Sequence, residues 1–289
     1  MNYNCLRLLC VHAHPDDESS KGAPTVAYYK SLGVQCTLVT CTGGEAGDIL
    51  NESLLDKINK ENIAFHRFSE LLRAASVIGY DKVITLNYKD SGMPNTSNND
   101  DPKSFARVPL EKTVLDLVKT IRKEKPHVII TYGADQQGYP HPDHIKVHQS
   151  TLLAYLLAPR IFYHTKDLEP WKPLKMYYHV FSFKRIKKIH EWFKNNQGRS
   201  PFDQRWLSRT NSQFEPITTS IPVGDFLQIR RAALVAHETQ IDPIKSPFFF
   251  IDTEVEKQLY PFEDYHLAHS RVGFPKVIER DLFFGVASN

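Results

Sequence analysis

The chain forms its first predicted strand and its main polar cluster within one stretch, Cys5-Leu6-Arg7-Leu8-Leu9-Cys10-Val11-His12-Ala13-His14-Pro15-Asp16-Asp17. The hydrophobic run 6–11 is typical of a buried strand. Pro15 has a fixed φ and no N–H, so it ends the strand after His14 and turns the chain. Histidine and carboxylate side chains that leave a strand end together can bind a divalent ion such as zinc. We expect His14 and Asp17 to bind one metal ion, with Asp16 beside it.

A polar turn is the alternative interpretation of this segment. Asp16 or Asp17 would then only cap the helix that follows. Because short motifs give many false positives, the segment alone does not decide between a metal site and a cap.

A second polar segment follows the fourth predicted strand and reads Tyr139-Pro140-His141-Pro142-Asp143-His144. Pro142 can begin a helix, which places His141 and His144 one turn apart. We predict His144 as the third metal ligand, a set that leaves a coordination position open for water. Asp143 can accept a hydrogen bond from a ring N–H and fix its tautomer. His148 is either a fourth ligand or a histidine bonded one turn below the site.

Alternating strand and helix patterns predict an α/β fold with a mostly parallel sheet and helices on both faces. The patterns predict strands at 6–11, 34–40, 82–86, 127–131, 174–183 and 217–223, and helices at 22–32, 60–79, 108–123, 142–157, 183–195 and 228–237. Ligands of such sheets bind beyond the carboxyl ends of the strands. The loops that carry His14, Gly43, Asp90 and His141 would gather at that edge.

Composition narrows the class of protein. The chain has 289 residues and a formal net charge of +3, which is too small and too dispersed to indicate nucleic-acid binding. No apolar run is long enough for a membrane span, and the N-terminus does not have a signal-peptide profile. The four cysteines show no CxxC spacing, so we expect reduced thiols in a cytoplasmic protein.

The two polar segments together resemble the zinc-dependent de-N-acetylase superfamily, which includes the PIG-L and LmbE-like proteins. The likeness rests on Ala13-His14-Pro15-Asp16-Asp17-Glu18 and His141-Pro142-Asp143-His144. Within the superfamily the chain is most similar to the mycothiol S-conjugate amidases, with further matches at Ser19-Ser20-Lys21, Thr42-Gly43-Gly44-Glu45, Asp90-Ser91-Gly92 and Ala236-His237-Glu238-Thr239-Gln240. The sister deacetylases of mycothiol biosynthesis lack a lysine that matches Lys21.

The resemblance implies a Rossmann-like fold and hydrolysis of an amide on a glucosamine nitrogen, with one Zn²⁺ per chain. We expect one domain, 1–289, with a core at 1–158 and a C-terminal α/β lobe at 159–289 that completes the pocket.

The resemblance also implies roles for individual side chains. Asp16 would act as general base and later protonate the amine. His141, held by Asp143, and the Tyr139 hydroxyl would donate to the oxyanion.

The expected substrate contacts follow from the same likeness. Arg67 and Asp90 would hold inositol or sugar hydroxyls, although Arg67 could equally be a surface arginine. Lys21 would reach the acyl or conjugate side, and Glu45 and His237 would form pocket walls. Glu18 is either a partner behind the site or a charge at a helix start.

The leading hypothesis is therefore a zinc amidase that splits mycothiol S-conjugates into glucosaminyl-inositol and a mercapturic acid, as in detoxification. A close alternative is the N-acetylglucosaminyl-inositol deacetylase or another LmbE-like sugar de-N-acetylase. A remote alternative is a non-catalytic sugar-binding protein, but binding alone does not need an unligated carboxylate such as Asp16. The partner is a small molecule, and the oligomeric state stays open.

Overall fold

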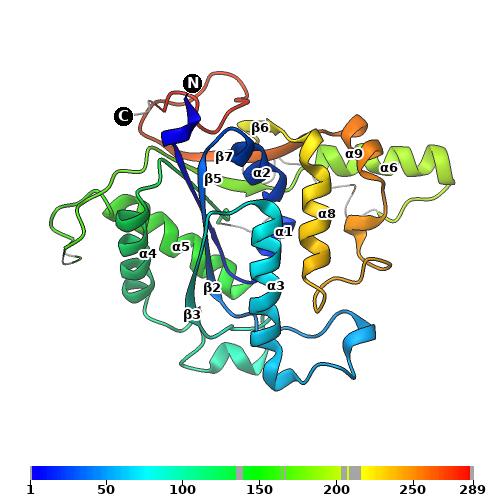
Figure 1. Ribbon diagram of the computed structural model, residues 1–289, viewed down its shortest axis with the longest axis horizontal. Helices are drawn as coiled ribbons and strands as arrows, with labels where there is room; N and C mark the ends of the chain where they lie inside the picture. The colour runs from blue at the N-terminus through cyan, green and yellow to red at the C-terminus, as the bar shows by residue number, and fades with distance from the viewer. Residues whose placement is uncertain are drawn as a thin grey trace.

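A computed structural model describes residues 2–134, 139–163, 165, 167–202, 207 and 216–286. Its centre is a seven-stranded sheet in the order β3-β2-β1-β4-β5-β7-β6 (Figure 1). The strands are β1 (Arg7–His12), β2 (Gln35–Thr42), β3 (Lys82–Tyr88), β4 (Val128–Thr131), β5 (Lys175–Val180), β6 (Thr219–Pro222) and β7 (Phe262–Ser270). Strands β1 to β5 pair in parallel, whereas β7 runs antiparallel to both β5 and β6. The predicted mostly parallel sheet is confirmed.

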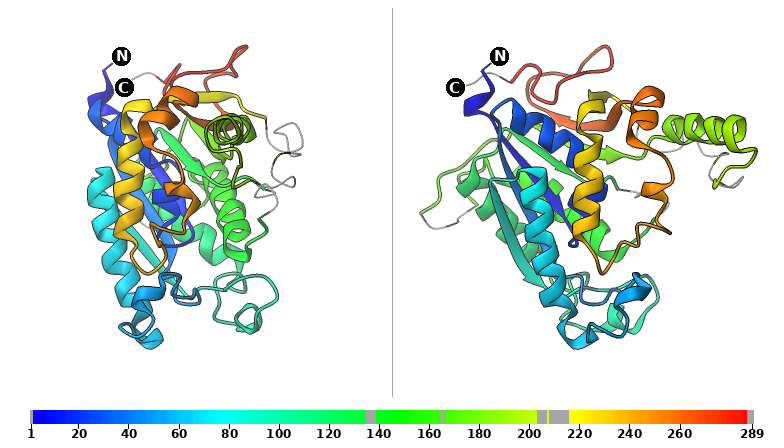
Figure 2. Two further views of the ribbon diagram at one scale, coloured as in Figure 1. Left: turned by 90° about the vertical axis from the view of Figure 1, so that its right-hand side faces the viewer. Right: turned by 45° about the vertical axis from the view of Figure 1, so that its right-hand side comes forward.

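Helices cover both faces of the sheet (Figures 1 and 2). They are α1 (Asp17–Ser20), α2 (Ala23–Ser31), α3 (Ile63–Ile78), α4 (Leu110–Glu124), α5 (Pro142–Leu157), α6 (Phe183–Gln197), α8 (Leu227–Ala236) and α9 (Thr253–Leu259). Helices α4 and α5 lie against one face, and α2, α3 and α8 lie against the other.

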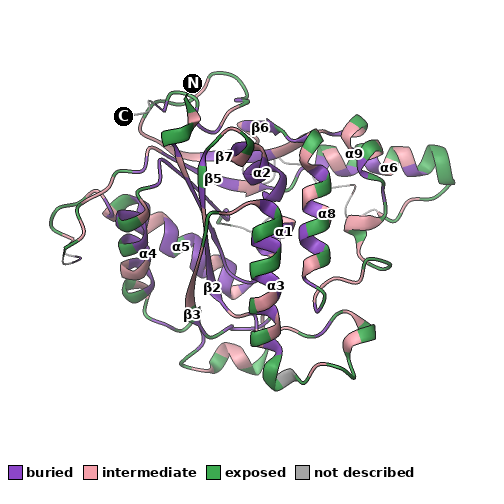
Figure 3. Cartoon of the chain, viewed as in Figure 1, coloured by how far each residue is buried: buried purple, intermediate pink, exposed green. Residues whose placement is uncertain are grey.

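Strand β1 shows why the two faces are both apolar. Leu8 and Cys10 pack into the core formed with α2, α3 and α8. Leu9 and Val11 point to the opposite side and pack with α4 and α5. Successive side chains of a strand alternate between faces, so a strand covered on both sides is a continuous hydrophobic run. Burial is accordingly concentrated along the sheet (Figure 3).

The C-terminal part differs from the prediction in two elements. Neither α9 nor β7 was predicted. Strand β7 is too polar to look like an inner strand, with the sequence Phe262-Glu263-Asp264-Tyr265-His266-Leu267-Ala268-His269-Ser270. Yet β7 is inserted between β5 and β6, so strands from 159–289 extend the same sheet that 1–158 begins.

The four cysteines carry no disulfide; Cys10, Cys36 and Cys41 are buried and Cys5 is exposed. Of the helices within the described residues, none is long and apolar enough to cross a membrane.

A buried ion pair ties the C-terminal segment to the sheet. Lys175 on β5 is fully buried, and its Nζ lies 2.7 Å from Glu279 Oε1. The hydroxyls of Tyr177 and Thr219 donate to Glu279 Oε2 over 2.8 and 3.0 Å. The carboxylate of Glu279 is therefore the partner that these three side chains share, although Lys175 and Tyr177 also donate to the carbonyl oxygens of Phe284 and Leu282.

Replacing Glu279 by leucine should lower the free energy of unfolding by about 3–5 kcal/mol, because it leaves the Lys175 ammonium buried without a counter-charge. Urea unfolding measures the loss. Lys257→Ala is the control, since it breaks an exposed pair with Asp225 and should leave the unfolding midpoint unchanged. Equal shifts of the two midpoints would contradict the prediction.

Candidate active site

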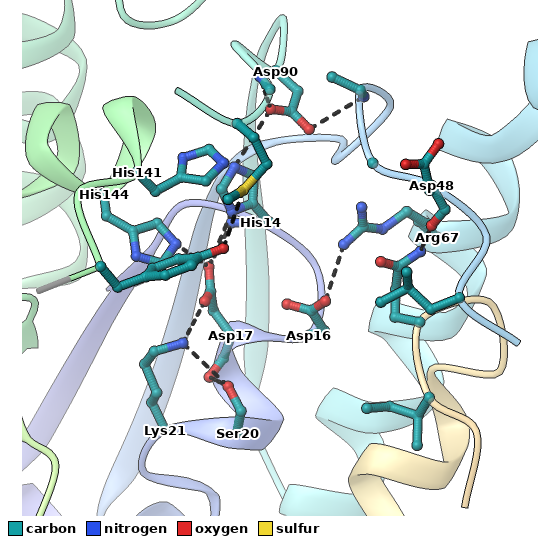
Figure 4. Close-up of a pocket in the computed structure, with 18 of the residues that line it drawn as sticks. His14, Asp16, Asp17, Ser20, Lys21, Asp48, Arg67, Asp90, His141 and His144 are labelled. Carbon is teal, nitrogen blue, oxygen red and sulfur yellow. Dashed lines mark hydrogen bonds and ion pairs between the residues drawn. The ribbon is translucent and has the colours of Figure 1, made fainter. Parts of the chain in front are cut away.

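Polar side chains from separate loops meet at the carboxyl ends of the parallel strands (Figure 4). The loop after β1 carries His14, and the loop after β3 carries Asp90. The segment that leads from β4 into α5 carries His141, and His144 lies in the first turn of α5. Residues far apart in the sequence thus line one cavity.

Asp17 lies close to both of the predicted histidine ligands. Asp17 Oδ2 lies 3.4 Å from His14 Nδ1 and 3.5 Å from His144 Nε2. Ligand atoms bound tetrahedrally to zinc at about 2.0–2.2 Å are roughly 3.4 Å apart. The three residues are buried. Two imidazoles and one carboxylate at these distances fit a divalent ion such as zinc.

Among the described residues, the groups whose ligand atoms all lie within 4.8 Å of one another are His14 with His141 and His144, and His14 with Asp90 and Asp143. The set with Asp17 rests on the two pairwise distances from Asp17 to the histidines. Asp90 and Asp143 contact His14 Nε2, the ring nitrogen that does not face Asp17. They therefore act on the ring and not on an ion at Nδ1. His141 is the alternative to Asp17 as the third ligand.

The His14 ring is held by carboxylates on its far side. Asp143 Oδ2 lies 3.2 Å from His14 Nε2 and also accepts the backbone N–H of Ser91 over 3.0 Å. Asp90 Oδ1 is 3.5 Å from the same ring nitrogen. Such partners fix the tautomer and orientation of a metal-ligating histidine. Asp143 was predicted to fix a ring, but its carboxylate contacts His14 and not His141.

His141 is instead held by main chain. Its Nδ1 accepts the backbone N–H of Asp143 over 3.2 Å, so the Nε2 of the neutral ring carries the proton. Burial, together with the charges of His14 and His144, lowers the pKa of His141 to about 3. A neutral imidazole with Nε2–H directed into the cavity is a hydrogen-bond donor. Tyr139 is close by: its ring centroid lies 6.1 Å from that of His141, and its hydroxyl contacts Met93 Sδ.

Lys21 lies at the edge of the cavity and pairs with a predicted ligand. Its Nζ is 2.7 Å from Asp17 Oδ1, whereas the two histidines contact the other carboxylate oxygen, Oδ2. Burial alone would raise the pKa of the Asp17 carboxyl, but the Lys21 and His144 charges and hydrogen bonds from both histidines hold that pKa well below its usual range. Asp17 is therefore kept ionised, as a metal ligand must be.

Asp16 is adjacent to the ligands without joining them. Its carboxylate Oδ2 lies 3.2 Å from Arg67 Nη2, and its side chain keeps 30% of its exposure. Burial raises the pKa of this carboxyl, the Arg67 charge opposes the rise and the Asp17 charge adds to it. A raised carboxyl pKa suits a group that must accept a proton and return it.

Arg67 has a role that the sequence analysis did not predict. It is buried, and its guanidinium donates to the carbonyl oxygens of Gly44 over 2.5 Å and Pro15 over 2.6 Å, as well as to Asp16. It thereby joins the loop after β2 to the loop after β1. It also lines the cavity, so the predicted sugar contact stays a prediction.

Two predicted pocket walls lie elsewhere. Among the described residues, the cavity lining does not include Glu45 or His237. Glu45 Oε1 accepts the backbone N–H of Asp90 over 3.0 Å. His237 is fully buried and its Nε2 lies 2.6 Å from Glu18 Oε1. Both residues therefore support the site from behind. The sequence around Glu45 and His237 has no feature that separates a residue in the pocket wall from one behind it.

The cavity has a volume of about 610 Å³, which is within the usual range for a small-molecule site. Its apolar walls were not predicted; they are formed by Leu50, Met93, Leu234, Ile241 and Phe248. Leu234, Ile241 and Phe248 belong to the C-terminal part of the chain. Both halves of the sequence therefore contribute to the same pocket.

Comparison with known proteins places this geometry in context. Residues 9–155 match the family described as "PIG-L: GlcNAc-PI de-N-acetylase". The chain is 41% identical to the mycothiol S-conjugate amidase of Streptomyces coelicolor, over 98% of both chains. It is 35% identical to the 1D-myo-inositol 2-acetamido-2-deoxy-alpha-D-glucopyranoside deacetylase 2 of Catenulispora acidiphila, over 96% of this chain and 97% of that one. The N,N'-diacetylchitobiose deacetylase of Pyrococcus horikoshii shares the fold, with a TM-score of 0.63, 18% identity, and coverage of 90% of this chain and 83% of the other.

Proposed function

Because the chain belongs to the PIG-L family of de-N-acetylases, we propose that it is a zinc-dependent amidase of mycothiol S-conjugates. It hydrolyses the amide on the glucosamine nitrogen and releases glucosaminyl-inositol and a mercapturic acid. The observation that carries this proposal is the 41% identity to a mycothiol S-conjugate amidase over 98% of the chain. The reduced cysteines favour a cytoplasmic location.

His14, Asp17 and His144 would hold the zinc ion. A zinc ion bound there supplies a Lewis acid that polarises the substrate carbonyl and lowers the pKa of water. Lys21 and Asp143 keep the ligands in place, because each pairs with one of them on the side away from the ion.

Asp16 and His141 perform the proton and charge chemistry. Asp16 takes a proton from the attacking water as the new C–O bond forms, and returns a proton to the amine nitrogen as the C–N bond breaks. The Nε2–H of His141, and the Tyr139 hydroxyl beside it, donate to the negative oxygen of the tetrahedral intermediate. The direct products are a carboxylic acid and an amine, and transfer of the acid proton to the amine gives a carboxylate and an ammonium group.

The deacetylase of N-acetylglucosaminyl-inositol is the second candidate, since a relative of that activity is 35% identical over 96% of the chain. The two reactions differ only in the acyl group. Two features favour the larger acyl group. The apolar cavity walls offer the room that a bulky S-substituent needs, and Lys21 matches a lysine that the sister deacetylases lack.

We expect the purified enzyme, loaded with one equivalent of zinc, to have a kcat/KM at least about tenfold higher for a mycothiol S-conjugate than for N-acetylglucosaminyl-inositol. The released amine is measured for both substrates, with Asp16→Ala as the blank. A preference for the acetylated sugar would assign the chain to the deacetylases. No turnover of either substrate by the zinc-loaded enzyme would refute the proposed function.

A further inference from the structure

The backbone of Asp16 has an unusual conformation for a residue with a side chain. Its φ is +106° and its ψ is −25°, in the left-handed region, at the N-cap of α1. The other non-glycine residues with positive φ in the described part of the chain lie between 50° and 67°, near the ordinary left-handed value of about 57°. Strained residues persist only where their surroundings hold them, and they gather at functional sites.

Glu18 is the residue that holds this main chain. Its Oε2 accepts the backbone N–H of Asp16 over 2.9 Å. Its Oε1 accepts the Ser19 hydroxyl over 2.5 Å and contacts His237 Nε2 at 2.6 Å. Both oxygens of one fully buried carboxylate are therefore used next to Asp16.

His237 is the partner of Glu18 Oε1. It ends α8, and both it and Glu18 have no exposed surface. Burial alone would lower the pKa of His237, but the charge and hydrogen bond of Glu18 raise it above its usual value. The contact is a charge-assisted hydrogen bond.

Stability alone does not account for the pair. Replacing a buried ion pair by apolar side chains is often neutral or stabilising. The imidazole also leaves a buried Nδ1 with no hydrogen-bond partner among the described residues, which is unfavourable. Apolar side chains at both 18 and 237 would avoid both penalties.

We propose that Glu18 and His237 are a positioning pair, which holds the Asp16 main chain in its left-handed conformation and thereby directs the carboxylate into the cavity. The pair works from behind, and Arg67 holds the same carboxylate from the front. This inference rests on the proposed function, in which Asp16 is the general base.

The test compares three variants at the end of α8. His237→Leu removes the contact, His237→Gln keeps a donor for Glu18, and Thr239→Val is the matched control. Thr239 is equally buried and in the same segment, but its hydroxyl donates to Glu70 and not to Glu18. Each variant is checked for one bound zinc per chain and for its melting temperature.

We expect His237→Leu to lower kcat about a hundredfold with little change in KM, as displacement of a catalytic group by about 1 Å does. His237→Gln should recover most of that loss, and Thr239→Val should stay close to the wild-type rate. In an Asp16→Asn background, His237→Leu should have no further effect, since the residue it positions is already inactive. Equal losses of rate in His237→Leu and Thr239→Val would overturn the inference. So would a His237→Leu loss in kcat that is as large in the Asp16→Asn background as in the wild type.

Amide hydrogen exchange tests the same inference without turnover. Exchange in residues 13–21 should be faster in His237→Leu than in the wild type, and unchanged in Thr239→Val. If the wild-type enzyme hydrolyses neither substrate, the proposed function fails and the exchange comparison alone decides. Equal exchange in all three proteins would then refute the positioning role.

Discussion

Replacing Asp16 by asparagine should lower kcat by about 10²- to 10⁴-fold and leave one zinc ion bound per chain. General acid–base groups contribute rate factors of that size, and Asp16 is not among the predicted ligands. Asparagine is the sharpest substitution for two reasons. It tolerates positive φ better than most residues, and its side-chain oxygen can still accept from Arg67, which now contacts Asp16 Oδ2 at 3.2 Å. The substitution removes the negative charge and the capacity to take a proton, while the hydrogen bond from Arg67 can remain.

Asp16→Ala is the companion variant. It removes the Arg67 contact as well and places a β-carbon without a polar group at a φ of 106°. We expect it to lose the same activity and some thermal stability. Steady-state rates and metal analysis on both variants separate the two effects. An asparagine variant that keeps a tenth or more of the wild-type rate would show that another group is the base.

Removal of the metal should abolish turnover, and added zinc should restore it. The more decisive comparison is between Asp17→Ala and His141→Ala, because the two candidate ligand sets differ only at these positions. We expect Asp17→Ala to lose both bound zinc and all detectable activity. His141→Ala should keep zinc and lose about 10²- to 10³-fold in kcat, as the loss of an oxyanion donor does.

Zinc content measured on the purified variants, together with single-turnover rates, checks this prediction. His144→Ala serves as the positive control, since both ligand sets contain His144. Loss of zinc from His141→Ala with retention in Asp17→Ala would replace the proposed set by three histidines. Asp143 would then hold the His14 ring for a different ion geometry.

The sequence predicts candidate zinc ligands where chemistry and local geometry coincide, and their role as ligands stays a prediction. His14, Asp17 and His144 are recognisable because a proline ends a hydrophobic run at one site and begins a helix at the other. The order of strands and helices then implies that both segments reach the same edge of the sheet. These inferences need only the local pattern.

What could not be predicted depends on long-range packing. The contact between Glu18 and His237 joins residues 219 positions apart, and nothing in the sequence around His237 shows which way its ring points. Arg67 lies on the regular apolar pattern of α3, so its contacts with Gly44 and Pro15 follow only from the loops that reach it. Strand β7 was missed because its pairing, and not its polar composition, determines its place.

Because β7 is inserted between β5 and β6, the chain cannot be truncated between its two halves without breaking the sheet. Strand β5 pairs with β4, so a fragment that ends near residue 158 would expose the full edge of β4. An exposed, flat and hydrophobic edge such as Val128-Ile129-Ile130-Thr131 is a template for intermolecular strand pairing. The N-terminal fragment would carry every predicted zinc ligand and still be expected to aggregate. Protein engineering of the pocket is therefore better directed at the loops that surround it than at the boundary between the two halves.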